Sequence, residues 1–136
     1  MLREEDYCDY EASVALKELG YVGSAHECEC FGAYFNLGKD IFTDSLDNTE
    51  VGTDEFLRVP LYLAQKWLRE ELNIIVEVFV DDDSDTPITY NIHKDGECVF
   101  HHHGRYFAVK DWNLALLEGI KEAIKILKEE RKCFGL

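Results

Sequence analysis

The residues best suited to chemistry lie in the stretch 88–103, which ends in three consecutive histidines. Asp95-Gly96, between two apolar-rich runs, predicts a hairpin with a two-residue turn. Because side chains alternate between the faces of a strand, the three histidines are not expected to form one cluster. The face that is more apolar near the turn is predicted to be the core face. In this register it carries Ile88, Tyr90, Ile92, Val99, His101 and His103, and the other face carries Thr89, Asn91, His93, Cys98, Phe100 and His102.

His101 and His103 are the candidate metal ligands. Two histidines at i and i+2 on a strand can ligate one ion, and imidazole suits zinc, copper or nickel. A third ligand would have to come from His26, Cys28 or Cys30, but these span ~13 Å at strand rise, too far for one metal to take all three. No C-x-x-C spacing occurs. We therefore favour partly buried polar side chains at a sheet rim, and expect no bound metal and no cofactor.

Cys98 opposite His93 is a second candidate, a thiol beside an imidazole. Directly opposed Cβ atoms lie within ~5.5 Å, which permits a nucleophile with a neighbouring base. Glu77 is the candidate orienting acid, and no oxyanion hole is visible in the sequence. Both residues lie next to an exposed turn, where such pairs arise by chance. We favour the chance pairing and keep catalysis as the alternative.

Asp81, Asp83 and Asp85 match the D-x-D-x-D opening of a calcium-binding loop. The match fails where Thr86 replaces the required glycine and where Ile92 replaces the required glutamate. We interpret the segment as a solvated hairpin loop whose charge discourages edge-to-edge strand pairing, and keep a weak cation site as the alternative. The common motifs for phosphate, dinucleotide, serine hydrolase and zinc protease sites do not occur.

The net charge of −14 over 136 residues excludes general binding to nucleic acid phosphates and disfavours an anionic membrane surface. Acids exceed basic residues by 16 in residues 1–104, whereas basic residues exceed acids by 2 in the remainder. Such a field can steer a cationic partner, so that a basic protein is the predicted partner. A generally solvated acidic surface is the alternative.

The segment 40–55 is the predicted contact with that partner. Its carboxylates alternate with apolar residues, which combines electrostatic steering with apolar anchoring. The acids are Asp40, Asp44, Asp47, Glu50, Asp54 and Glu55, and the apolar residues are Ile41, Phe42, Leu46 and Val51.

The elements that position these residues follow from periodicity and from helix and turn signals. The order α-ββ-α-βββ-α predicts a single α+β domain, in which an N-terminal hairpin and a three-stranded antiparallel meander are packed by about three helices. Two small sheets, or a disordered 43–58 segment, are the alternatives. The predicted elements are a helix at 10–19 between Asp9 and Gly20, strands at 26–36 and 40–42, a surface loop at 43–58, a helix at 61–72 after Pro60, strands at 74–80, 88–93 and 98–103, and a helix at 112–130 after Asp111.

The five cysteines at positions 8, 28, 30, 98 and 133 are an odd number, and no apolar signal segment precedes them. No run of ~18 apolar residues occurs that could span a membrane. These observations predict a cytoplasmic protein with reduced thiols.

The run LAQKWLREELNI after a proline, the strands that follow it, and the run DWNLALLEGIKEAIKIL resemble a family of small uncharacterised proteins of gut bacteria and of their phages and prophages. An early ALKELGY-like helix leading into a strand with Cys and Tyr also fits, so that the resemblance covers most of the chain. The family has no established activity, and the resemblance therefore implies a fold and no catalytic residues. The triple histidine and the DDDSD loop lie outside its pattern.

Together these observations predict a non-enzymatic acidic interaction protein, phage-derived, that binds a basic protein partner. The alternative is a small metal-binding or Cys/His-dependent enzyme that uses the 88–103 hairpin.

Overall fold

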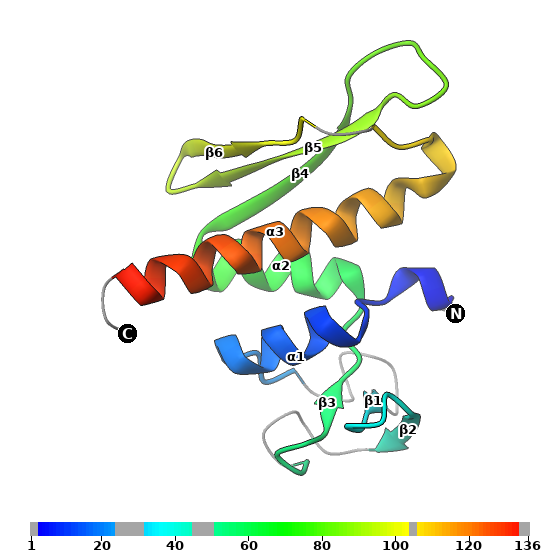
Figure 1. Ribbon diagram of the computed structural model, residues 1–136, viewed down its shortest axis with the longest axis vertical. Coiled ribbons are helices and arrows are strands. Elements are labelled where there is room, and N and C mark those ends of the chain that lie inside the picture. The colour runs from blue at the N-terminus through cyan, green and yellow to red at the C-terminus, as the bar shows by residue number, and fades with distance from the viewer. Residues whose placement is uncertain (1–2, 24–31, 45–50, 104–105, 134–136) are drawn as a thin grey trace. The chain divides into compact units, whose positions relative to one another are not determined.

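The computed structural model describes residues 3–23, 32–44, 51–103 and 106–133 (Figure 1). Its contacts divide the chain into two compact units, Met1–Ala64 and Gln65–Leu136. The class is α+β, and the described residues form two three-stranded antiparallel sheets, the alternative that the sequence left open.

Helix α1 (Tyr10–Leu19) of the first unit begins and ends as the sequence predicts. The Asp9 side chain accepts a hydrogen bond of 2.9 Å from the Ala12 N–H, which satisfies one of the unpaired amides of the first turn. Gly20 has a φ of 105°, a left-handed conformation that glycine adopts without strain. Leu16 and Leu19 are buried on the inner face of the helix.

The first sheet has β1 (Gly32–Phe35) between β2 (Ile41–Asp44) and β3 (Phe56–Leu57). The prediction of an uninterrupted surface loop at 43–58 is wrong at its end, because Phe56 and Leu57 are buried and pair with β1. The part of the predicted strand at 26–31 lies outside the described residues.

Helix α2 (Leu61–Leu72) leads through Asn73 into the second sheet. Asn73 has a φ of 52°, and its side-chain amide donates to the Asp95 carboxylate at 2.8 Å, which ties the end of the helix to the hairpin turn. Gln65 donates at 2.8 Å to the backbone carbonyl of Val76 on the edge strand β4. This bond satisfies a polar group of the edge strand.

The second sheet is a meander in the order β4 (Ile74–Val80), β5 (Ile88–Lys94) and β6 (Glu97–His101). Asp95 and Gly96 connect β5 to β6 with φ values of 53° and 85°, the positive pair of a type I′ turn. The meander that Asp95-Gly96 predicts is therefore confirmed, although β6 ends at His101 and not at His103.

The predicted register of the hairpin is confirmed next to the turn and wrong beyond Cys98, because a β-bulge interrupts it. Ile92 pairs with Phe100 and His93 with Cys98, which leaves Val99 as the extra residue. Beyond the bulge every side chain changes face relative to the prediction. His101 therefore lies opposite Asn91, and not on the face of Tyr90.

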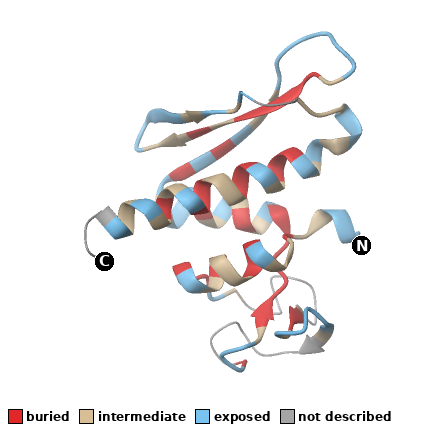
Figure 2. Cartoon of the chain, viewed as in Figure 1, coloured by how far each residue is buried: buried red, intermediate tan, exposed pale blue. Residues whose placement is uncertain are grey.

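Helix α3 (Trp112–Cys133) follows a short 3-10 turn (Val109–Asp111) and packs across β4 and β5 (Figure 1). A Cβ on Gly119 would lie 2.5 Å from Val76 Cγ1, so that the glycine permits a close approach of helix to sheet. Trp112, the first residue of the helix, is 39% exposed. The buried residues of the helix face are Ala115, Leu116, Ile120, Ala123, Ile124 and Leu127 (Figure 2).

Candidate functional site

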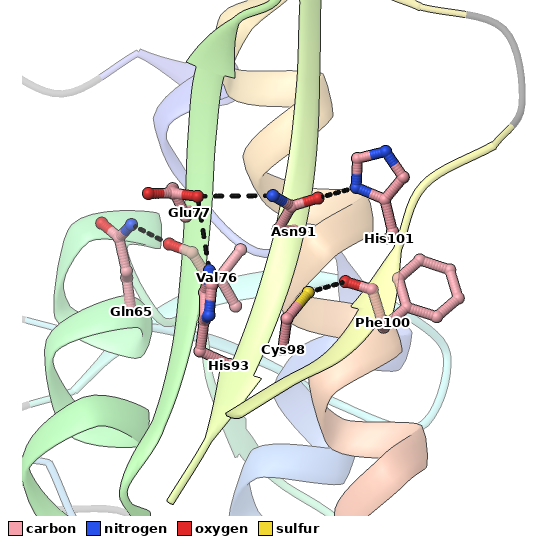
Figure 3. A network of polar contacts seen from close by, with 8 residues as sticks. All are labelled: Gln65, Val76, Glu77, Asn91, His93, Cys98, Phe100 and His101. Atoms are coloured by element: carbon pink, nitrogen blue, oxygen red, sulfur yellow. Dashed lines mark hydrogen bonds and ion pairs between the residues drawn. The ribbon is translucent and has the colours of Figure 1, made fainter. Parts of the chain in front are cut away.

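The face of the second sheet opposite the buried stripe carries most of the candidate residues, and we name it the polar face (Figure 3). Strand alternation places Glu77 and Asn91 on it as a cross-strand pair, and His93 opposite Cys98. The bulge at Val99 adds His101, which the regular register would have placed on the core face. The polar face consists of Glu77, Asn91, His93, Cys98 and His101.

A chain of hydrogen bonds crosses the three strands of this face (Figure 3). Asn91 Nδ2 donates to Glu77 Oε1 at 3.5 Å, and Asn91 Oδ1 contacts His101 Nδ1. Asn91 therefore links the carboxylate of Glu77 on β4 to the imidazole of His101 on β6, and the chain orients both side chains.

The thiol–imidazole pair has part of the geometry that catalysis needs. His93 Nε2 lies 3.4 Å from Glu77 Oε1, so that the predicted orienting acid is in place. The Cys98 thiol, however, donates to the Phe100 carbonyl at 3.5 Å. Cys98 is exposed, and the side chain of Glu77 is 51% exposed, so that water weakens the electrostatic coupling. The arrangement orients the imidazole of His93, while the thiol of Cys98 is hydrogen-bonded to a backbone carbonyl.

His101 and His103 come together although the bulge changes their predicted face. Their ring centroids are 5.1 Å apart in an edge-to-face arrangement. Over the described ranges, no group of three or more His, Cys, Asp or Glu side chains is placed to hold a metal ion. His26, Cys28 and Cys30, the suggested additional ligands, lie outside the described residues.

The acidic loop between β4 and β5 is exposed from Asp81 to Asp85. Asp82 accepts hydrogen bonds from the hydroxyl and the backbone N–H of Ser84, and these bonds lower the pKa of Asp82. Tyr106 donates its hydroxyl proton to Asp81 at 2.8 Å, which raises the pKa of Tyr106. Two of the carboxylates are thus held by neutral donors, as in a solvated loop.

The predicted contact segment 40–55 is described in two parts, 40–44 and 51–55. Asp40 and Ile41 are exposed at the start of β2, an edge strand of the first sheet. Phe42 stacks on Tyr34 at 5.6 Å between ring centroids. Asp44 ends β2, whereas Leu46, Asp47 and Glu50 lie outside the described residues.

The other end of this segment is tied to helix α1. Lys17 Nζ donates to the backbone carbonyls of Gly52 and Glu55 at 3.1 and 2.7 Å. Burial lowers the pKa of Lys17, against the opposing effect of the Glu55 and Asp54 carboxylates. Val51 is 8% exposed, so that it is part of the core and not an apolar anchor for a partner. In the described part, the exposed predicted contact residues are Asp40 and Ile41 at one end of the segment and Asp54 at the other.

A cavity in the second unit was not predicted from the sequence, and His102, Tyr106 and Glu118 line it together with other residues. His102 and Tyr106 follow β6, whereas Glu118 belongs to α3, and the bulge brings His102 onto the face of Tyr90. The spacing of these residues in the sequence matches no motif that would have predicted the cavity.

No family model, curated protein or solved structure matches this chain. The helices in the described ranges include none with the length and apolar character needed to span a membrane.

Proposed function

We propose that the protein is a non-enzymatic interaction protein, phage-derived and cytoplasmic, that binds a basic protein partner through the acidic segment 40–55. The observation that carries the proposal is the exposure of Asp40 beside Ile41, which is 49% exposed, on the edge strand β2. A carboxylate next to an exposed apolar side chain suits a cationic partner with an apolar contact. The phage origin rests on the sequence resemblance alone.

The net charge of −14 supports the electrostatic half of this proposal. A field of this sign accelerates the encounter with a cationic partner, and salt screens it over ~8 Å at physiological ionic strength. Exposed ion pairs add little affinity individually. Apolar contact at Ile41 would then slow dissociation, while the carboxylates set the association rate.

The test is a charge reversal with a matched control in the other unit. The contact variant changes Asp40, Asp44 and Asp47 to Lys, and the control changes Asp82, Asp83 and Asp85 to Lys. Both variants shift the net charge equally, so that a difference between them reports location and not total charge. A native pull-down at low salt first identifies the partner captured by the wild type.

With that partner purified, the association rate is measured over a range of salt concentrations. We expect the contact variant to lose binding, and the control to retain most of it. Equal loss in both variants would indicate nonspecific charge attraction. Unchanged capture by the contact variant would exclude the segment as the interface, and turnover of a metabolite by the wild type, with no partner, would refute the proposal.

The second candidate function is a Cys/His-dependent enzyme, favoured by the contact of Glu77 with His93 opposite Cys98. It requires that His93 activate the thiol. The rate of iodoacetamide labelling at Cys98, followed by peptide mass spectrometry, tests this in the wild type and in His93→Gln. A fall of ~10-fold at neutral pH in the variant would favour catalysis. The hydrogen bond of the thiol to Phe100 leads us to expect no such fall.

A further inference from the structure

A cavity of about 610 Å³ lies beside the first turns of α3, within the second unit. This volume is in the range of sites that hold a small molecule or a large side chain. Neither the polar face nor segment 40–55 contributes to it. The lining residues that matter for the argument are His102, Tyr106, Phe107, Lys110, Asp111 and Glu118.

One wall of the cavity is aromatic and rigid. The His102 ring stacks on buried Tyr90 with centroids 4.7 Å apart, and the Phe107 ring lies 5.8 Å from the His102 ring with an interplanar angle of 30°. Backbone bonds fix these rings, because His102 N–H donates to the Tyr90 carbonyl at 3.2 Å, and Phe107 exchanges two bonds with Ile88. The wall is therefore in place before any ligand arrives.

The charge of the lining is negative. Among the described lining residues, Asp111 and Glu118 oppose one cation, Lys110, and neither acid forms an ion pair with another described residue. The N-terminus of α3 contributes the equivalent of about half a positive charge, which is too little to reverse the sign. Burial and then the carboxylates of Glu118 and Glu122 raise the pKa of Tyr90 to about 12, so that their potential reaches the aromatic wall.

We propose that this cavity binds an organic cation, an alkylammonium or guanidinium group, between the aromatic wall and the carboxylates of Asp111 and Glu118. Aromatic faces attract cations through their quadrupole, and a carboxylate adds a charge-assisted hydrogen bond. The cation can belong to a free amine or to the side chain of a peptide. The site lies in the other unit from segment 40–55, so that it stands independently of the proposed function.

The rim of the cavity offers a surface for the remainder of a larger ligand. Val109 is 66% exposed, Trp112 39% and Leu114 48%, and all three belong to the 3-10 turn or to the start of α3. A peptide would cover this apolar rim, whereas a free amine would leave it exposed. The two sources of the cation are therefore distinguished by two measurements: the affinity for a peptide compared with a free amine, and the effect of substituting a rim residue on that affinity.

The experiment titrates agmatine, which carries both a guanidinium and an ammonium group, into the full-length chain. Amide chemical shifts are followed by NMR. We expect saturable shifts at residues 106–111 and at Glu118, with Kd on the order of millimolar. Glu118→Gln should weaken binding roughly tenfold, and Lys110→Met should leave it unchanged or strengthen it, because Lys110 repels the ligand.

Glu129→Gln is the matched control, since Glu129 is exposed on the same helix and does not line the cavity. It should leave Kd unchanged. A peptide, acetyl-Gly-Arg-Gly-amide, forms the second arm. Tighter binding of the peptide, lost in Trp112→Ala, assigns the cation to a polypeptide, and equal or weaker binding assigns it to a free amine.

Three results would overturn the proposal. One is the absence of saturable shifts up to ~50 mM agmatine, which lies far above the expected Kd. Another is equal weakening by Glu118→Gln and Glu129→Gln, which indicates charge attraction to the whole surface. The third is binding of inorganic phosphate that weakens in Lys110→Met, which makes the cavity an anion site. Thermal melts of each variant verify that the fold is kept.

Discussion

The two faces of the second sheet are built by the same three strands and have opposite properties. The core face carries Val76 and Ile92, which are essentially inaccessible to water, beneath helix α3. The polar face carries Glu77 and Cys98, which are exposed (Figure 2). A step of one residue along a strand thus separates groups that stabilise the fold from groups that are available for chemistry.

The bulge at Val99 determines which residues of β6 fall on each face. It turns Phe100 toward Tyr90, with ring centroids 6.0 Å apart, and places His101 in the polar network. A regular hairpin would have placed the imidazole at the core and the phenyl ring outside. Burying a phenyl group contributes about 1.5–3 kcal/mol, whereas burying an imidazole costs free energy unless it is hydrogen-bonded. The bulge therefore places each side chain in the environment it prefers.

The largest expected effect comes from the core face. Ile120→Ala should lower the free energy of unfolding by ~2–5 kcal/mol, because the side chain is fully buried and its removal leaves a cavity. The matched change on the polar face, Glu77→Ala, should cost no more than ~1 kcal/mol, since its bonds are long and exposed. Urea denaturation measures both. Similar costs for the two variants would contradict the assignment of faces.

The next largest change in the free energy of unfolding is expected for Gly119→Ala. In an exposed helix this change stabilises by about 1 kcal/mol, but here the new Cβ would meet Val76 Cγ1 at 2.5 Å. We expect a loss of ~1–3 kcal/mol from overpacking. The double variant Gly119→Ala with Val76→Ala should recover part of that loss beyond additivity. A stabilising Gly119→Ala would mean that helix and sheet are not in close contact.

Tyr90 makes the core face sensitive to alkaline pH. Burial first, and then Glu118 and Glu122, raise the pKa of its phenol to about 12, whereas the phenol of an unfolded chain ionises near pH ~10. The stability from the neutral phenol is full below pH ~10. Between there and the folded pKa the unfolded state holds fewer protons, so that stability falls as pH rises.

Tyr90→Phe should remove this part of the alkaline loss. The measurement is the urea midpoint of both proteins from pH 8 to 12, in steps of about half a unit. Tyr106 titrates in both proteins, so that its contribution cancels in the difference. An unchanged difference between wild type and variant across this range would show that Tyr90 ionises as it does in the unfolded chain.

The sequence predicted those features that depend on neighbouring residues. The cap at Asp9, the helix end at Gly20 and the Asp95-Gly96 turn are local, because the conformation of a few adjacent residues determines each one. Strand pairing across the bulge was not predictable in this way. A single extra residue changes the face of everything beyond it, and no composition signal marks Val99.

The candidate sites divide in the same way, into those that local sequence patterns predict and those that depend on the bulge. Glu77, His93 and Cys98 meet as the alternation predicted, because their shared face depends on strands that precede the bulge. The cavity beside α3 depends on His102, which follows the bulge, and on a helix far along the chain. The short strand β3 escaped prediction because two apolar residues among acids carry too little periodicity to indicate a strand.

Deletion of Val99 is expected to change the free energy of unfolding least, and it tests most directly which residues of β6 lie on each face of the second sheet. Val99 is the unpaired residue and is 45% exposed, so that its removal joins two pairs that already exist, His93 with Cys98 and Ile92 with Phe100. The resulting hairpin is regular and keeps every side chain on its present face. We expect the free energy of unfolding to change by no more than ~1 kcal/mol, as for other exposed positions.

If the regular register held in the intact protein, with Val99 opposite Ile92, the same deletion would exchange the faces of Phe100 and His101. Phe100 would then move to the core face and His101 to the polar face, and both residues would change their pairing partners in β5. Urea denaturation of the deletion variant, with amide exchange across β5 and β6, distinguishes the two registers.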